Sequence, residues 1–243
     1  MKRLLDRVCA VAGVGGSLGE AVALRFREEG GLVVGIDRHE HGIGQLALSA
    51  DLSDERQTRE AYAKIWDEFG RLDVIYNNAG LIHQDDHSAL DLELDVWSDV
   101  RTSNLTTTWL SCKHGIPLLL RTEPTRGSII NTASFLAGMG AASAQMAFNV
   151  AKAGVEQLSR DLGVQLARRG VRVNALALGP IETPQLSEIF ARIGPDEVER
   201  RFLHMPMGRF GTIEELAATA AYLGTHINVS VGMMAAREGR VGL

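Results

Sequence analysis

The chain has 243 residues, of which 45% are hydrophobic and 23% charged, and its net charge is −5. This length suits one domain with a substantial core, and the acidic balance argues against a nucleic-acid partner or an anionic membrane. The sequence has no apolar run long enough to span a bilayer, and the widely spaced Cys9 and Cys112 indicate buried thiols rather than a metal site, so we expect a cytoplasmic protein.

The first half of the chain alternates short apolar runs with amphipathic stretches. Strands are predicted in "RVCAVAG", "LVVGID" and "LALSADL", and a helix closed by glycine is predicted in "SLGEAVALRFREEG". Ser53 is expected to cap a second helix, which has Asp54 and Glu55 in its first turn and ends at Gly70.

The second half continues the alternation. "LDVIYNNAG" predicts a fourth strand that runs into a loop, and a long helical region near Val96 to Leu120 precedes a fifth strand in "GSIINTAS". "AFNVAKAGVEQLSRDLGVQLARRG" predicts a further helix and "VRVNALALG" a sixth strand. The whole pattern predicts one α/β domain over residues 1–243, a Rossmann-like, doubly wound parallel sheet with helices on both faces.

A glycine-rich turn joins the first strand to the first helix. In "VAGVGGSLGEA", glycine permits a tight turn and lets backbone N–H groups approach a pyrophosphate at the helix N-terminus. Asp37 closes the second strand, where a carboxylate suits the ribose hydroxyls of NAD and repels the 2′-phosphate of NADP. The pattern favours NAD(H), although Arg38 beside Asp37 leaves NADP(H) as an alternative. An ordinary turn, with Asp37 as a turn former, is the other interpretation.

These features together resemble the short-chain dehydrogenase/reductase (SDR) family, and within it the 3-oxoacyl-acyl-carrier-protein-reductase-like branch. The resemblance rests on the glycine turn, "NNAG", a serine after the fifth strand, a helical lysine and "RVNALALGPIETP", and it covers nearly the whole chain. It implies that a loop over about residues 184–207 forms a substrate lid. It also implies a homotetramer built through helices near Val96 to Leu120 and Gln145 to Arg169.

The resemblance assigns roles by position. Asn104 matches an asparagine that holds a proton-relay water, Ser134 a serine that hydrogen-bonds the substrate oxygen, and Lys152 a lysine that binds the nicotinamide ribose. Ser17 stands where the family usually has a glycine. The implied cofactor contacts are Gly13, Ser17, Leu18, Gly19, Asp37, Asp51, Leu52, Asn78, Ala79, Gly80, Lys152, Gly179, Ile181 and Thr183.

Phe148 occupies the position of the family's catalytic tyrosine, four residues before Lys152 on one helical face. Phenylalanine keeps the ring and removes the ionisable hydroxyl. Three explanations are open: an introduced substitution, a natural protein without turnover, or an enzyme with another proton source. That source would be a water held by Ser134, Lys152 and Asn104, or else His83 or His87.

The sequence thus predicts an NAD(H)-dependent oxidoreductase that interconverts a secondary alcohol and a ketone, with an activity lowered by Phe148. The alternative is a catalytically silent, NAD-binding pseudoenzyme with a binding or regulatory role. Both hypotheses expect a small-molecule ligand.

Overall fold

In this computed structural model, the described residues are 2–39, 41–139, 145–184, 186–188 and 207–225. They contain a parallel sheet with the strand order β3-β2-β1-β4-β5-β6. The strands are β1 (Val8–Ala12), β2 (Leu32–Asp37), β3 (Leu46–Ser49), β4 (Val74–Asn77), β5 (Ser128–Ser134) and β6 (Arg172–Leu178). This α/β architecture confirms the predicted fold class.

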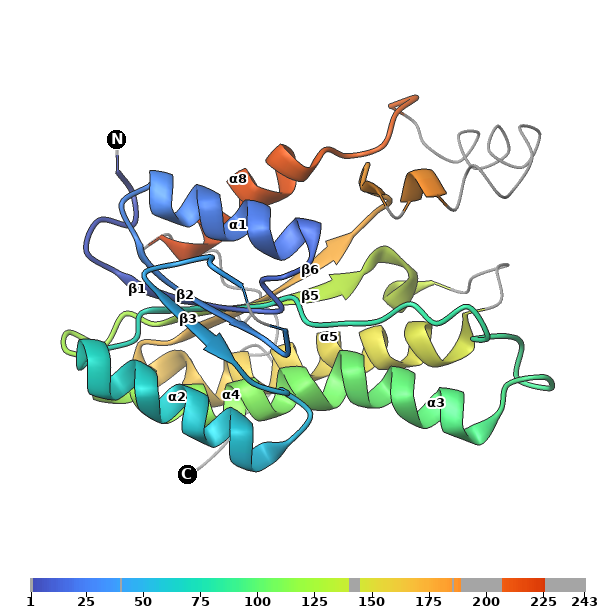
Figure 1. The fold of residues 1–243 in the computed structure, drawn as a ribbon, viewed down its shortest axis with the longest axis horizontal. Coiled ribbons are helices and arrows are strands. Elements are labelled where there is room, and N and C mark those ends of the chain that lie inside the picture. Colours follow the sequence, from blue (N-terminus) through green and yellow to red (C-terminus); the bar gives the residue numbers. More distant parts are fainter. Residues whose placement is uncertain (1, 40, 140–144, 185, 189–206, 226–243) are drawn as a thin grey trace.

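Helices cover both faces of the sheet, as Figure 1 shows. Helices α1 and α8 lie on one face, and α2, α4 and α5 lie on the other, with α3 continuing toward α4. Their bounds are α1 (Ser17–Glu28), α2 (Glu55–Phe69), α3 (Leu94–Arg101), α4 (Thr107–Arg121), α5 (Met146–Leu166) and α8 (Ile213–Gly224).

Two hydrophobic cores follow from the alternation of side chains along each strand. In β1, Val8, Ala10 and Ala12 belong to the core beneath α2, α4 and α5. Cys9 and Val11 belong to the core shared with α1 and α8. Because neighbouring strand residues point to opposite faces, a continuous apolar run is the pattern that a sheet covered on both sides requires.

The start of α2 corrects one prediction. The N-cap is Asp54, whose side chain accepts the N–H of Gln57, and not Ser53. Ser53 is engaged elsewhere, because both its N–H and its hydroxyl donate to Asp51 Oδ1. The predicted end is confirmed, since Gly70 caps α2 in the left-handed conformation with φ 61°.

None of the helices in the described residues has both the length and the apolar run that a bilayer span needs. The predicted lid falls largely on residues 185 and 189–206, which lie outside the described residues. Helix α8 begins with a capping box formed by Thr212 and Glu215.

Candidate functional site

Predicted site residues from five strands meet at the carboxyl edge of the sheet. Gly13 follows β1, Asn78 follows β4 and Gly179 follows β6, while Asp37 and Ser134 end β2 and β5. The parallel register aligns these ends, because Ala12 pairs with both Ile36 and Asn77, and Ser134 pairs with Leu178. In open α/β sheets this edge is where ligands bind.

The glycine turn is closely packed at two positions and open at a third. Gly13 has φ 85°, and a Cβ there would lie 2.4 Å from the Ala79 nitrogen. A Cβ on Gly19 would lie 2.1 Å from the Gly13 carbonyl oxygen. At Gly16, the N-cap of α1, a Cβ would meet nothing within 4 Å. Only glycine therefore fits the two packed positions, and open space at the helix start suits a pyrophosphate.

Asp37 reaches from the end of β2 to this turn. Its Oδ2 accepts the N–H of Gly15 at 2.9 Å. On the other side of the turn, the Asn78 side chain donates to the Gly13 carbonyl at 3.3 Å, and the Ala79 N–H donates to the Ala12 carbonyl at 3.0 Å. The structure thus joins the predicted pyrophosphate and ribose residues into one unit.

The remaining residues predicted for the adenine side differ in exposure. Ser17 and Leu18 are half-buried at the start of α1, and the Leu52 side chain is buried in the core beneath α2. Asp51 is half-buried. Burial disfavours its charged form, but the hydrogen bonds from Ser53 prevail and lower the pKa of Asp51. Asp51 is therefore an anionic acceptor beside the end of β3.

Lys152 lies inside the protein with one hydrogen bond to the sheet. Its side chain is 5% exposed, and Nζ donates to the Thr132 carbonyl oxygen at 2.9 Å. Burial lowers the pKa of this ammonium to about 8, because the charged form loses solvation. Lys152 therefore loses its proton near pH 8, which is close to neutral pH.

Asn104 lies in a π-helical turn, Thr102–Thr106, that interrupts the predicted long helix between α3 and α4. Its Nδ2 donates to the Val100 carbonyl at 2.9 Å and to the Leu81 carbonyl at 2.8 Å. The side chain thus enters the helical hydrogen-bond ladder at its i−4 carbonyl, which is a physical cause of such a turn. Oδ1 is buried without a hydrogen-bond partner among the described residues.

Gly80 brings Asn104 and Lys152 together. The position of a Cβ on Gly80 is 2.6 Å from Asn104 Oδ1 and 3.6 Å from Lys152 Nζ. Asn104 Oδ1, near the Lys152 ammonium, is an acceptor without a partner among the described residues. An ordered water there would satisfy it, because buried polar atoms need hydrogen-bond partners. The relay role that the resemblance implies for Asn104 stays a prediction.

Phe148 and Lys152 lie on the same side of α5. The ammonium is 5.6 Å from the centroid of the Phe148 ring, within the range of a cation–π contact. Ser134 is buried at the end of β5, where its hydroxyl accepts the N–H of Leu136 at 3.3 Å.

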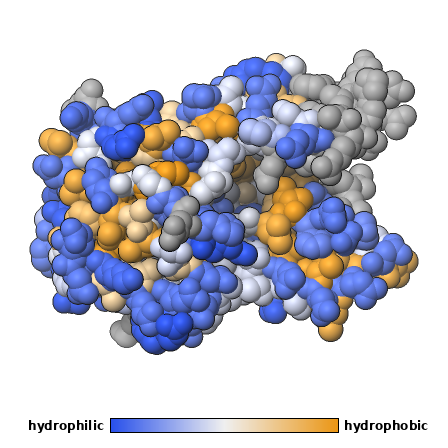
Figure 2. Space-filling view, in the orientation of Figure 1, coloured by the Kyte–Doolittle hydropathy of each residue, from blue (hydrophilic) through white to orange (hydrophobic). Residues whose placement is uncertain are grey.

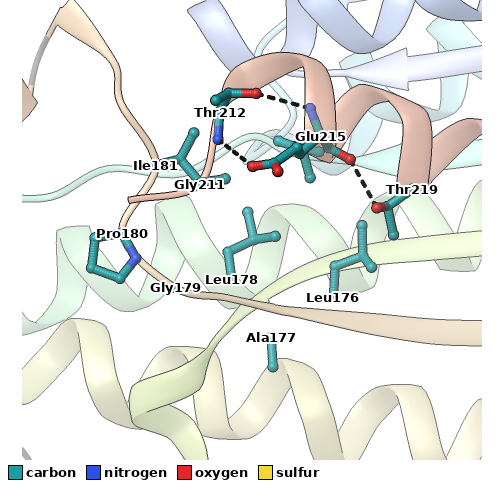
Figure 3. Close-up of a pocket in the computed structure, with 11 residues that line it drawn as sticks. Leu176, Ala177, Leu178, Gly179, Pro180, Ile181, Gly211, Thr212, Glu215 and Thr219 are labelled. Carbon is teal, nitrogen blue, oxygen red and sulfur yellow. Dashed lines mark hydrogen bonds between the residues drawn. The ribbon is translucent and has the colours of Figure 1, made fainter. Parts of the chain in front are cut away.

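The loop after β6 is fastened to the start of α8. Gly211 donates its N–H to the Pro180 carbonyl at 3.0 Å and accepts the Glu182 N–H at 2.9 Å. A pocket of about 360 Å³ lies between this loop and α8, and Figure 3 shows Gly179 and Ile181 on its wall. Thr183, the third residue predicted here, is half-buried.

None of the tyrosines in the described residues is placed to supply the hydroxyl that Phe148 lacks. Tyr62 and Tyr76 are fully buried, and burial raises the pKa of both, that of Tyr76 to about 12. Tyr222 lies on α8, on the opposite face of the sheet from Phe148. His83 is half-buried and its Nδ1 accepts the Asp85 N–H at 3.1 Å, whereas His87 is exposed.

Two residues at the site were not found from the sequence. The Thr132 carbonyl holds Lys152, and the Asp86 carboxylate accepts the N–H groups of Ala147 and Phe148. A backbone carbonyl carries no sequence signal. Asp86 is too far along the chain from α5 to be read as its cap, so local patterns give no signal for it either.

The chain is similar to known proteins along most of its length. Residues 13–230 match the protein-family profile described as Enoyl-(Acyl carrier protein) reductase. The chain is 30% identical over 242 residues to the uncharacterized oxidoreductase YxbG of Bacillus subtilis, covering 93% of this chain and 86% of that protein. It is 29% identical over 236 residues to the 3-oxoacyl-[acyl-carrier-protein] reductase FabG of Thermotoga maritima, covering 92% of each.

The fold has solved counterparts at similar identity. The crystal structure of levodione reductase matches with a TM-score of 0.84 and 28% sequence identity, and the match covers 92% of both chains. The family-profile match over residues 13–230 includes the glycine turn from Gly13 onward, the "NNAG" segment and the helix that carries Phe148 and Lys152.

Proposed function

This chain belongs to the short-chain dehydrogenase/reductase family of NAD(P)-dependent oxidoreductases, and from that premise we propose that it interconverts a secondary alcohol and its ketone with NAD(H). The observation that carries the proposal is the grouping of Lys152 Nζ and the orphaned Asn104 Oδ1 around Gly80, at the edge where Ser134 ends β5. We further propose that Phe148 lowers the rate.

The residues around the glycine turn fit a dinucleotide. The open space at Gly16 leaves room for phosphates at the start of α1, and the Asp37 carboxylate beside Gly15 suits ribose hydroxyls. The same carboxylate disfavours a 2′-phosphate, which supports NAD(H) over NADP(H). When bound, the nicotinamide supplies or accepts the hydride; the chain's own residues do the rest.

The chain's own groups position the substrate oxygen and its proton. The Ser134 hydroxyl would donate a hydrogen bond to that oxygen. Lys152 would hold the ribose, and its ammonium would favour negative charge nearby. A water on Asn104 Oδ1 would link Lys152 to solvent, because this acceptor has no protein partner among the described residues.

Phe148 removes the group that would exchange a proton with the substrate oxygen. A positioned general acid–base contributes about 10² to 10⁴ in rate, or roughly 3 to 5 kcal/mol. The phenyl ring keeps its packing against Lys152, so dinucleotide binding and Ser134 should be unaffected. We therefore propose an intact binding site with slow turnover.

A second function is favoured by the same ring. The Lys152 ammonium lies 5.6 Å from the centroid of the Phe148 ring, and none of the tyrosines in the described residues is placed to supply a hydroxyl there. A protein that binds NAD(H) and signals its level, without turnover, would need the dinucleotide site and not the hydroxyl.

The experiment that separates these functions is Phe148→Tyr, assayed for NADH-linked reduction of a panel of ketones. The enzyme hypothesis expects a rise of about 10² to 10⁴ in kcat. Phe135→Tyr is the control, because it adds a hydroxyl next to Ser134 but outside α5. An unchanged rate in Phe148→Tyr, with NADH still bound, would favour the silent dinucleotide-binding protein.

We also propose a homotetramer through the two long helical regions. Exposed apolar side chains lie along them, namely Trp109 on α4 and Val150 and Val164 on α5. Figure 2 shows further apolar surface at the end of the molecule where α3 begins. Leu90, in the loop that precedes α3, is 95% exposed. Exposed apolar surface of this kind marks protein contacts. Light scattering that finds only monomer would exclude this assembly.

A further inference from the structure

The first turn of α5 is held by a segment about sixty residues earlier in the chain. Asp86 Oδ1 accepts the Ala147 N–H and Oδ2 accepts the Phe148 N–H, both at 2.9 Å. The His87 carbonyl accepts the Met146 N–H at 3.4 Å. Three consecutive N–H groups that a helix start leaves without helical partners are thus satisfied from one segment.

Asp86, and not the N-cap residue of α5, provides the side-chain cap of this helix. The N-cap residue Gln145 makes no side-chain capping bond, whereas the Asp86 side chain is buried, with the residue 2% exposed. A buried carboxylate that accepts two N–H groups at a helix N-terminus is a strong, charge-assisted contact. Its neighbour Asp85 is exposed, so the two carboxylates of this loop differ sharply in environment.

The loop from Gly80 to His87 also contacts Asn104 and Lys152. It starts at Gly80, against Asn104 and Lys152, and the Leu81 carbonyl accepts the Asn104 side chain at 2.8 Å. The loop therefore fixes Asn104 at one end and the backbone of Phe148 at the other. Phe148 in turn lies 5.6 Å from the Lys152 ammonium.

We propose that Asp86 is a positioning residue, which sets the side chain at position 148 against Lys152 by holding the first turn of α5. Its importance for a reaction rests on the proposed function. The geometric effect does not, because it concerns only the arrangement of Asp86, Phe148 and Lys152.

The titration of Lys152 distinguishes positioning from simple stabilisation. Removal of a nearby negative charge by itself lowers the pKa of a lysine, because the charged form loses an attraction. Loosening of the Phe148 ring has the opposite sign, because water then reaches the ammonium and relieves the burial that holds its pKa near 8. A rise therefore reports repositioning and not loss of charge.

The experiment is competitive acetylation of Lys152 across pH, read by mass spectrometry on the full chain. The variants are Asp86→Ala and Asp86→Asn, and Asp85→Asn is the control that removes the same charge from an exposed site on the same loop. We expect the pKa of Lys152 to move from about 8 toward 10.5 in Asp86→Ala, and by less in Asp86→Asn, which keeps one acceptor. The Asp85→Asn protein should match the parent.

Two further readouts complete the test. The amide hydrogens of Ala147 and Phe148 should exchange about tenfold faster in Asp86→Asn than in Asp85→Asn, because their acceptor is weakened. In the Phe148→Tyr background, Asp86→Asn should lower kcat about tenfold and leave the KM for NADH unchanged. If Asp86→Ala does not fold, Asp86→Asn alone decides.

A Lys152 titration in the Asp86 variants equal to that of Asp85→Asn would overturn the proposal, even if thermal stability fell. If the Phe148→Tyr protein reduces no ketone, the proposed function fails. The acetylation and exchange results would still decide the role of Asp86 independently.

Discussion

The Lys152 ammonium lies 5.6 Å from the centre of the Phe148 ring, and both side chains project from the same part of α5. A tyrosine at position 148 would place its hydroxyl at the far edge of that ring. Under the proposed function, this arrangement keeps the surroundings of a catalytic acid–base and lacks its hydroxyl.

The burial of Lys152 gives a pH dependence of stability. Its pKa is lowered from 10.5 to about 8, so between these values the unfolded chain binds more protons than the folded one. Stability should therefore rise with pH through this window, and below pH 8 the buried charge costs about 3 kcal/mol. In urea denaturation, the unfolding free energy of the parent relative to that of Lys152→Met should increase by about 3 kcal/mol as the pH rises from about 8 to 10.5. A constant difference would contradict the burial of a charged lysine.

A substitution at Gly16 should change NADH affinity without changing the stability of the fold. In Gly16→Ala the added methyl group meets no protein atom within 4 Å, so the melting temperature should change by no more than about 2 °C. The same methyl group would hinder phosphate approach, and NADH affinity should fall about tenfold. Gly42→Ala is the control, because its Cβ would also meet nothing within 4 Å. Equal NADH affinity in both variants would place the phosphates elsewhere.

Asp37 should set the choice between the two dinucleotides. Asp37→Asn keeps an oxygen for the Gly15 N–H and removes the charge that repels a 2′-phosphate. We expect the preference for NADH over NADPH, measured as a ratio of dissociation constants, to fall about tenfold or more. Asp67→Asn removes the same charge from an exposed site on α2 and should leave the ratio unchanged. If Asp37→Asn behaves like this control, another residue sets the specificity.

A buried polar network beneath the site should matter for stability. The Tyr62 hydroxyl lies 2.5 Å from Ser111 Oγ, which also bonds Asn77 Oδ1, and Asn77 donates to Asn131 at 2.8 Å. Ser111→Ala leaves two buried polar atoms without their partner, at a cost of about 2 to 3 kcal/mol. Ser49→Ala, at an exposed site, should cost less than about 0.5 kcal/mol. Urea denaturation midpoints compare the two, and equal losses would mean that the network adds nothing.

The sequence predicted the sheet and its helices well, because apolar periodicity and glycine punctuation report local structure directly. "LVVGID" is β2 from end to end, and α2 ends at Gly70 as expected. The error at Ser53 arose because two residues suitable for capping are adjacent, and Asp51 takes Ser53. Which residue caps depends on a contact that the residue pattern does not contain.

The site was predictable where a residue type carries the chemistry, and not where a contact does. Lys152, Asn104 and Ser134 were predicted by type and position, and their roles stay predictions. The π-helical turn at Asn104 depends on its side chain reaching the Val100 carbonyl, and the role of Asp86 depends on a loop folding back onto α5. The first is a local contact within the helix and the second is a tertiary contact, and residue propensity encodes neither of them.

The proposed function requires an intact NAD(H) site in which only position 148 lacks a catalytic group. The most direct test is a calorimetric titration of the protein as it stands with NADH, and in parallel with NADPH. We expect micromolar binding of NADH, with NADPH at least about tenfold weaker because of Asp37. Absence of binding by either dinucleotide would contradict the account, because the glycine turn would then not be a dinucleotide site and the oxidoreductase function would fall with it.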